Sequence, residues 1–223
     1  VEQCRIQMAQ ADAAAQAVRQ YIRRFRVPCY DEKTGRGLLR NLYASTNGAG
    51  ESLICLLGNG ERAPHESELV ELLRQAVPSA VGIVWGVNRR KGNVILGDSY
   101  RTLWGEDTLR DTLWGLTFRL SVPSFYQVNR AQAEVLYRKA VDFAGLTGEE
   151  TVLDLYCGAG TIGLSMVRPG QKLIGVEVVE SAVQNARQNA LKAGIHHAEF
   201  ICADAGQAAK ILAARGERPD VIV

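Results

Sequence analysis

Hydrophobic residues change their spacing along the chain, and the change predicts two kinds of domain. In residues 5–26 they recur every three to four positions, which predicts an amphipathic helix that ends before Pro28. Short apolar runs lie on both sides of Asn47–Gly50, a sequence typical of a hairpin turn. A second helix is predicted over Pro64–Ala76. With the short strands between them, these helices predict an α+β domain over residues 1–120. The predicted strands are 38–46, 52–57, 81–87, 94–97, 101–104, 108–113 and 116–120.

Strand and helix alternate regularly in residues 121–223. Asn129 stands where it can cap a helix over 130–144, and Gly145 follows where that helix should end. Alternation of this kind predicts a doubly wound α/β domain with a parallel sheet and a ligand at the carboxyl ends of its strands. The first helix is expected to bury Val135, Leu136, Ala140, Phe143 and Ala144. The later elements are predicted as strands at 152–155, 172–178, 198–202 and 219–223 and helices at 180–193 and 205–214.

A glycine-rich stretch follows the first strand of this domain. Gly158, Gly160 and Gly163 have the spacing of the dinucleotide-binding fingerprint, which is a weak signal when it stands alone. Glycines allow a tight turn, and the turn places free amide groups at the start of a helix. The stretch therefore predicts a site for a nucleotide-like ligand and leaves an NAD-linked dehydrogenase open as an alternative.

Three carboxylates distinguish between such ligands. Asp154 ends the strand before the glycines, Glu177 ends the next strand, and Asp204 follows the third. Each residue alone could equally be a helix N-cap. Together they favour a cationic, adenosine-bearing cofactor, because a pyrophosphate would be repelled by Asp154.

Composition and charge narrow the class of protein. The five cysteines are odd in number and form no C-x-x-C pair, so we expect no disulfide framework and a reducing, cytoplasmic location. No apolar run reaches the roughly 20 residues needed to span a bilayer. Residues 1–120 carry 16 Lys and Arg against 13 Asp and Glu, whereas residues 121–223 carry 10 against 11. Basic clusters at 19–40 and Arg89–Lys91 could meet phosphates or simply be solvated, which leaves a non-catalytic RNA-binding module as a further alternative.

Four segments together resemble a known family, the RNA 5-methyluridine (uracil-C5) methyltransferases. They are Ser124–Asn129, Asp154–Thr161, Gly175–Glu177 and Tyr30–Arg40. Of these, Tyr30–Arg40 and Ser124–Asn129 together are most similar to the 23S rRNA branch of Gram-positive bacteria. The resemblance implies a class I, Rossmann-like methyltransferase domain over 121–223, preceded by an RNA-facing α+β central domain. It implies S-adenosylmethionine as cofactor and RNA as partner, with rRNA favoured over tRNA, and we expect a monomer.

The resemblance also implies roles for individual residues. Phe125 and Gln127 match positions that face a flipped-out uracil, and Cys4 matches the last of four ligands of an iron–sulfur cluster. The other three cluster ligands would lie upstream. The positions implied or predicted to contact the cofactor are Gln127, Asp154, Tyr156, Gly158, Gly160, Thr161, Glu177 and Asp204.

The chain begins at Val1 and ends within a predicted strand, so we expect a fragment of a longer protein whose methyltransferase domain is truncated at its C-terminus. No residue matches the family's nucleophilic cysteine or its glutamate base. We therefore expect no catalytic residue in this chain and no activity from it alone. Cys157 is not expected to substitute, because a thiol within the cofactor turn would not face the base.

Overall fold

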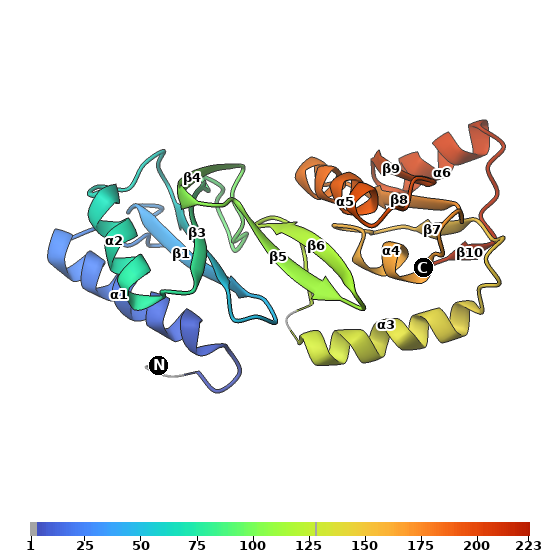
Figure 1. Cartoon of the computed structure of the whole chain (residues 1–223). Coiled ribbons are helices and arrows are strands. Elements are labelled where there is room, and N and C mark those ends of the chain that lie inside the picture. Colours follow the sequence, from blue (N-terminus) through green and yellow to red (C-terminus); the bar gives the residue numbers. More distant parts are fainter. Residues whose placement is uncertain (1–3, 128) are drawn as a thin grey trace. The chain divides into compact units, whose positions relative to one another are not determined.

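The chain forms two compact units in the computed structural model, which describes residues 4–127 and 129–223 (Figure 1). The first unit ends at Leu109 and the second spans Arg110–Val223. The boundary therefore falls earlier than the residue 120 predicted from the sequence. The physical reason is the hairpin in whose first strand this boundary falls, because buried apolar side chains of the hairpin belong to the hydrophobic core of the second unit. The strands of this hairpin are β5 (Thr108–Leu113) and β6 (Leu116–Ser121), and the buried side chains are Leu113, Phe118 and Leu120.

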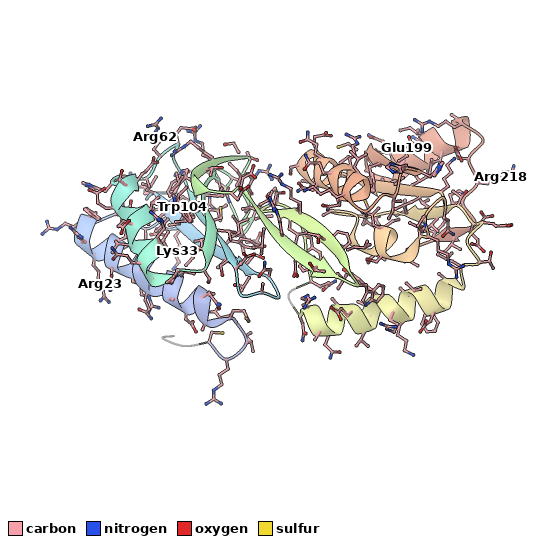
Figure 2. The ribbon with its side chains drawn as sticks, viewed as in Figure 1. Arg23, Lys33, Arg62, Trp104, Glu199 and Arg218 are labelled. Carbon is pink, nitrogen blue, oxygen red and sulfur yellow. The ribbon has the colours of Figure 1, made fainter. Side chains whose placement is uncertain are left out.

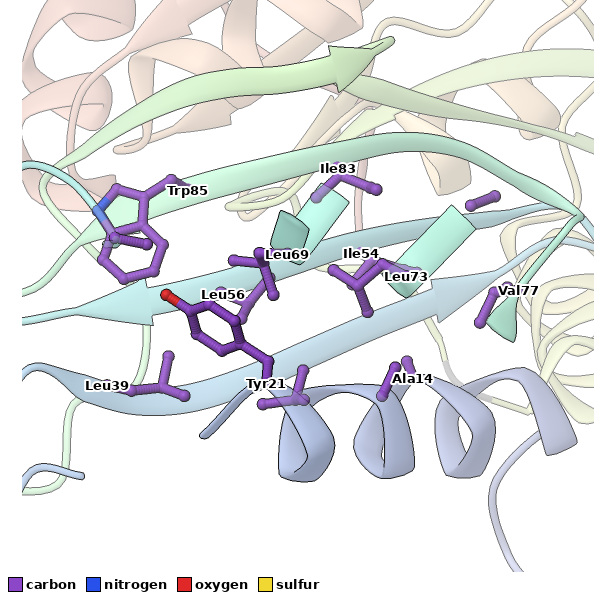
Figure 3. Close-up of a cluster of buried hydrophobic side chains, with 14 of the residues drawn as sticks. Ala14, Tyr21, Leu39, Ile54, Leu56, Leu69, Leu73, Val77, Ile83 and Trp85 are labelled. Atoms are coloured by element: carbon purple, nitrogen blue, oxygen red, sulfur yellow. The ribbon is translucent and has the colours of Figure 1, made fainter. Parts of the chain in front are cut away.

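The first unit is a four-stranded mixed sheet with two helices packed on one face. Its strands lie in the order β1-β2-β3-β4; β2 and β3 are parallel and the outer pairs are antiparallel. Figure 3 shows Ile54 and Leu56 of β2 beside Leu69 and Leu73 of α2, with Tyr21 of α1 below them. Each such side chain contributes roughly 1.5–3 kcal/mol by its burial. The elements are α1 (Ala9–Phe25), β1 (Leu39–Thr46), β2 (Ser52–Gly58), α2 (Glu66–Ala76), β3 (Ala80–Val87) and β4 (Ser99–Gly105).

The predicted strand at 94–97 is wrong. The carbonyl groups of Val94 and Ile95 accept hydrogen bonds from the side-chain amide of Asn88, at 2.6 and 3.0 Å, instead of pairing with a neighbouring strand. The amide of Gly97 likewise donates to the hydroxyl of Tyr100. The segment is therefore a loop organised by side chains.

The second unit has a parallel sheet in the order β10-β7-β8-β9, beside the β5–β6 hairpin. Side chains of α3, α4 and α5 form a hydrophobic core with one face of the sheet, and side chains of α6 form a second core with the opposite face. This three-layer arrangement confirms the Rossmann-like fold predicted from the alternation of strand and helix. The elements are α3 (Arg130–Ala144), β7 (Val152–Asp154), α4 (Thr161–Met166), β8 (Leu173–Glu177), α5 (Glu180–Lys192), β9 (Ala198–Cys202), α6 (Ala205–Ala214) and β10 (Val221–Ile222).

Helix α3 has the predicted bounds but buries a different face. Its buried residues are Ala133 and Tyr137, whereas Val135, Leu136 and Phe143, expected in the core, are 53%, 56% and 87% exposed. Tyr137 turns the helix this way, because its ring packs edge-on against Trp114 and its hydroxyl lies 3.4 Å from Thr161 Oγ1. Despite these exposed apolar side chains, no helix in the described residues is long and apolar enough to cross a membrane.

Candidate functional site

The candidate site lies at the carboxyl ends of β7, β8 and β9. Sheet register pairs Asp154 with Gly175 and Glu177 with Cys202, so the strands end at the same edge. The strand order reverses between β7 and β10, and ligands of open α/β sheets bind outside such a reversal. The acids that the sequence analysis selected are therefore brought to one edge of the sheet.

Asp154 is the last residue of β7 and is only 4% exposed. Its Oδ2 accepts a hydrogen bond of 2.9 Å from the amide of Gly163, which fastens α4 to the strand. Burial raises the pKa of Asp154 to about 6; the Gly163 amide opposes the rise and the charge of Glu177 adds to it. Folding therefore makes the ionised form of this carboxyl group less favourable than it is in water.

Glu177 ends β8 and holds the glycine-rich turn. Its Oε2 accepts from the amide of Gly158 at 3.1 Å, and its Oε1 accepts from the amides of Val178 and Val179 at 2.8 and 2.9 Å. Three backbone donors fix the orientation of one side chain. Because each carboxylate oxygen can accept more than one hydrogen bond, Glu177 keeps capacity for hydroxyl donors of a ligand.

Asp204 is exposed and caps α6, because its Oδ1 accepts from the amide of Gln207 at 2.8 Å. The helix-cap interpretation that the sequence left open is confirmed for this residue. Its Oδ2 forms no hydrogen bond within the described part of the chain, so the cap leaves one carboxylate oxygen for a ligand.

The glycines of the fingerprint serve backbone conformation and packing. Gly158 and Gly160 have φ values of +54° and +81°, in the left-handed region that side chains disfavour. A Cβ on Gly160 would lie 2.9 Å from Leu164 Cδ1. One on Gly163 would lie 3.0 Å from the Asp154 carboxylate. Glycine at these positions allows α4 to start close against β7.

The segment that precedes α3 reaches the same turn. The carbonyl oxygen of Phe125 lies 3.7 Å from where a Cβ on Gly158 would stand. The Phe125 side chain is 73% exposed, and that of Tyr156, from the turn itself, is 79% exposed. Gln127 is half-buried. The backbone of Phe125 therefore adjoins the glycine-rich turn, and both aromatic residues are largely exposed to solvent.

Two asparagines of α5 connect these parts, and the sequence analysis missed both. Asn185 donates to the hydroxyls of Ser121 and Ser124, at 2.9 and 3.1 Å. Asn189, 1% exposed, accepts from the amide of Arg119 and donates to the carbonyls of Arg119 and of Ala159 in the glycine-rich turn. The available signal was two asparagines four residues apart on the apolar face of a helix.

Thr161 and Cys157 are buried within the turn. Thr161 begins α4, and its hydroxyl faces that of Tyr137. Burial raises the pKa of the Cys157 thiol, and the charges of Asp154 and Glu177 raise it further. The thiol stays protonated at neutral pH and cannot act as a nucleophile there.

Cys4 belongs to the first unit, whereas the residues of the site described above belong to the second. Its amide donates to Asp12 Oδ2 at 3.3 Å. Among the described residues there is no group of three or more His, Cys, Asp and Glu side chains that could hold a metal ion. One thiol does not fit an iron–sulfur cluster, which needs four protein ligands.

Known proteins similar to this chain include methyltransferases. Residues 146–223 match the family model described as "Methyltransferase domain". An uncharacterized RNA methyltransferase of Halalkalibacterium halodurans is 39% identical over 224 residues, covering 100% of this chain and 49% of that protein. One of Listeria innocua is 43% identical over 190 residues, covering 84% and 41%. The chain spans about half the length of the curated relatives that it matches.

A solved structure shares the fold. It is the Pyrococcus abyssi tRNA (uracil-54, C5)-methyltransferase in complex with S-adenosyl-L-homocysteine, with a TM-score of 0.74 and 25% identity. The match covers 92% of this chain and 49% of that one. With the matched family model and the parallel sheet described above, this similarity shows that the second unit has the Rossmann-like fold of a methyltransferase domain.

Proposed function

We propose that the chain is the cofactor-binding and RNA-facing part of an S-adenosylmethionine-dependent RNA methyltransferase that forms 5-methyluridine, in 23S rRNA. The observation that carries the proposal is the placement of Asp154, Glu177 and Asp204 at three neighbouring strand ends. Three carboxylates favour a cation over a pyrophosphate. The names of the relatives support RNA as substrate, and the Pyrococcus enzyme supports uracil C5 as the methylated position.

The residues present fit this cofactor. Glu177 is oriented by three amides to accept hydrogen bonds from the two ribose hydroxyls. Asp204 offers Oδ2 to the adenine amino group, and Asp154 contributes negative charge beside the cationic part. The positive φ of Gly158 lets the backbone approach the ligand closely. When bound, S-adenosylmethionine would supply an electrophilic methyl group on a sulfonium.

The side chains before α3 would meet the RNA base. Phe125 is exposed and adjoins the glycine-rich turn, so its ring is available to stack on a uracil that has left its own stack. Stacking on an aromatic side chain contributes about 1–3 kcal/mol per base, comparable to the cost of unstacking. Gln127, half-buried in the same segment, would face the edge of that base.

Methylation of uracil C5 needs a nucleophile as well as these binding groups. C5 becomes reactive when a cysteine thiolate adds to C6, and a base then removes the C5 proton. Cys157 is buried and protonated, so the proposal assigns neither step to residues of this chain.

Calorimetric titration of the protein with S-adenosylmethionine tests the cofactor assignment. Glu177→Gln removes a charge and one acceptor, and should weaken binding at least about tenfold. Glu180→Gln is the matched control, since this exposed carboxylate lies one turn further on, 3.8 Å from Arg187, and should bind as the wild type does. Binding of NADH without binding of S-adenosylmethionine would refute the proposal in favour of a dehydrogenase.

The RNA target needs a separate experiment. Deleting the gene from its host should remove one 5-methyluridine from 23S rRNA, as measured by mass spectrometry of nuclease digests. Loss of the modification from tRNA alone would contradict the assignment to rRNA, and an unchanged content in both RNAs would contradict uracil C5 as the target.

A further inference from the structure

One edge of the first unit gathers basic residues from three separate loops. The register pairs Leu39 with Gly58 and Gly58 with Val87, so the start of β1 and the ends of β2 and β3 lie at the same edge. We call this edge the three-loop edge. Its loops are residues 29–40, 59–65 and 88–98.

Charge is concentrated at the three-loop edge. Its loops carry seven Lys and Arg against four Asp and Glu, whereas the rest of residues 1–109 carries seven against eight. The loops are therefore the part of this unit with a net basic excess, because acidic residues elsewhere in the unit offset the arginines of α1. The seven are Lys33, Arg36, Arg40, Arg62, Arg89, Arg90 and Lys91.

Arg40 joins two of the loops. Its guanidinium donates to the carbonyls of Asn88, Arg90 and Gly92, at 3.0, 2.7 and 3.3 Å, and lies 4.1 Å from the ring centre of Tyr30. These partners are neutral carbonyls and a ring, so no carboxylate cancels the charge of Arg40. The remaining loop, residues 59–65, is bound to the loop of residues 29–40, because the amide of Asn59 donates to the carbonyl of Leu38 at 2.7 Å.

The fully buried Asn88 gives the last loop its shape. Its side-chain amide donates to two carbonyls further along the loop, and its Oδ1 accepts from the amide of Arg90 at 3.0 Å. The loop that presents Arg89, Arg90 and Lys91 is therefore ordered before any ligand arrives. Preorganised side chains lose less entropy on binding than flexible ones.

Several cations of the three-loop edge are available to an anion. Lys33, Arg36, Arg62 and Lys91 are exposed and form no ion pair within residues 4–127 and 129–223; Figure 2 labels Lys33 and Arg62 among the side chains of this unit. Arg89 pairs with Glu61 at 2.6 Å, and Arg90 pairs with Asp98. Exposed pairs of this kind contribute only about 0–1 kcal/mol, so a phosphate can replace the carboxylate at little cost.

We propose that the three-loop edge binds the phosphate backbone of RNA. The inference rests on the proposed function, because it is the RNA substrate that supplies the phosphates. Each loop contributes at least one unpaired cation, and the paired strands β1, β2 and β3 hold the three loops at one edge. Binding through phosphates is independent of base sequence and falls steeply with salt, because each neutralised phosphate releases counterions. This edge therefore holds the RNA, while recognition of the target base is left to the second unit.

Fluorescence anisotropy with a labelled 23S rRNA hairpin tests the proposal. The double variant Lys33→Glu/Lys91→Glu should lower the affinity at least about tenfold and make the salt dependence less steep by about two in log–log slope. The matched control is Arg23→Glu/Arg24→Glu, which makes the same change of charge on exposed positions of α1 and should lower the affinity much less. Circular dichroism checks that both variants fold.

The outcomes separate this inference from the proposed function. Equal losses in the two double variants, or a larger loss in the α1 variant, would overturn the three-loop edge as the RNA site. An acidic peptide that binds as tightly as the RNA would also overturn it and make the edge a protein-binding surface. S-adenosylmethionine titrations of the same variants should be unchanged. If no variant and no wild type binds that cofactor, the proposed function fails while the RNA result still stands.

Discussion

Replacing Asp154 by asparagine should remove a pH dependence of stability from the second unit. The pKa of this carboxyl rises from 3.8 to about 6 on folding, chiefly by burial. Between these values the folded state binds more protons than the unfolded state, so stability is greatest at low pH and is lost as the pH rises through about 6. Linkage gives a loss of about 1.4 kcal/mol between pH 5 and pH 8, and roughly 3 kcal/mol over the whole shift.

Urea denaturation at pH 5 and pH 8 measures this effect. From pH 5 to pH 8 the wild type should lose about 1.4 kcal/mol of unfolding free energy that Asp154→Asn does not lose. The stability of the variant relative to the wild type should therefore be higher at pH 8 than at pH 5 by that amount. Asp142→Asn, an exposed carboxylate on α3, is the control and should follow the wild type. Glu150, whose pKa is lowered to about 2, titrates below this window. Parallel behaviour of wild type and Asp154→Asn would refute the argument that folding makes this charge costly.

Three further results are expected. Asn189→Ala should lower the unfolding free energy measured by urea denaturation by about 1–3 kcal/mol, because it removes a buried hydrogen bond to the carbonyl of Ala159 and two part-buried ones to the backbone of Arg119; a loss below about 1 kcal/mol would show that water replaces them. Gly175→Ala should cost about 1–3 kcal/mol in the same assay, since a Cβ there would lie 2.5 Å from a phenylalanine ring; unchanged stability would mean that the ring moves freely. Alkylation of the native protein followed by mass spectrometry should label the exposed Cys29 and spare the buried Cys55 and Cys157, and rapid labelling of Cys157 would contradict its burial.

Helix bounds were predictable where a side-chain cap or a glycine marks them, whereas α1 and α2, predicted from residue 5 and from Pro64, begin at Ala9 and Glu66. The helix over 130–144 was predicted from Asn129 and Gly145; the structure shows the Asn129 side chain accepting from the amide of Gln132 and Gly145 in the left-handed conformation. Asp204 was considered as a possible N-cap, and the helix expected over 205–214 does begin directly after it. Caps act within one turn, so neighbouring residues suffice to identify them.

Features that depend on distant partners were not predictable. The strand predicted at 94–97 does not form because the side chain of Asn88 donates hydrogen bonds to the carbonyls of this segment. The spacing of apolar residues cannot predict such a contact. The prediction of the buried face of α3 was wrong because both sides of that helix carry apolar residues. Contact with Trp114 determines that the side of Tyr137 is the buried one. Apolar spacing predicts a helix but does not say which side is covered.

The positions of the three carboxylates of the candidate site were predictable from the sequence, but the asparagines that hold its segments together were not. Strand–helix alternation was enough to expect Asp154, Glu177 and Asp204 at one edge, since parallel strands end together. The hydrogen bonds of Asn185 and Asn189 connect residues that are 30 to 70 positions apart in the chain. Their role follows only from tertiary structure.

The position of β7 between β8 and β10 has a consequence for synthesis on the ribosome. β8 follows β7 closely, so this pair can form as soon as both have left the exit tunnel. β10 comes much later: Thr151 and Asp220, which flank the β7–β10 pair, are separated by 69 residues. Closing so long a loop is slow, and until then β7 has an unpaired edge that can join another chain. The strand that carries Asp154 is thus the first strand of its sheet to be made, whereas its second neighbour is the last, so its free edge stays open to wrong pairing for the longest time.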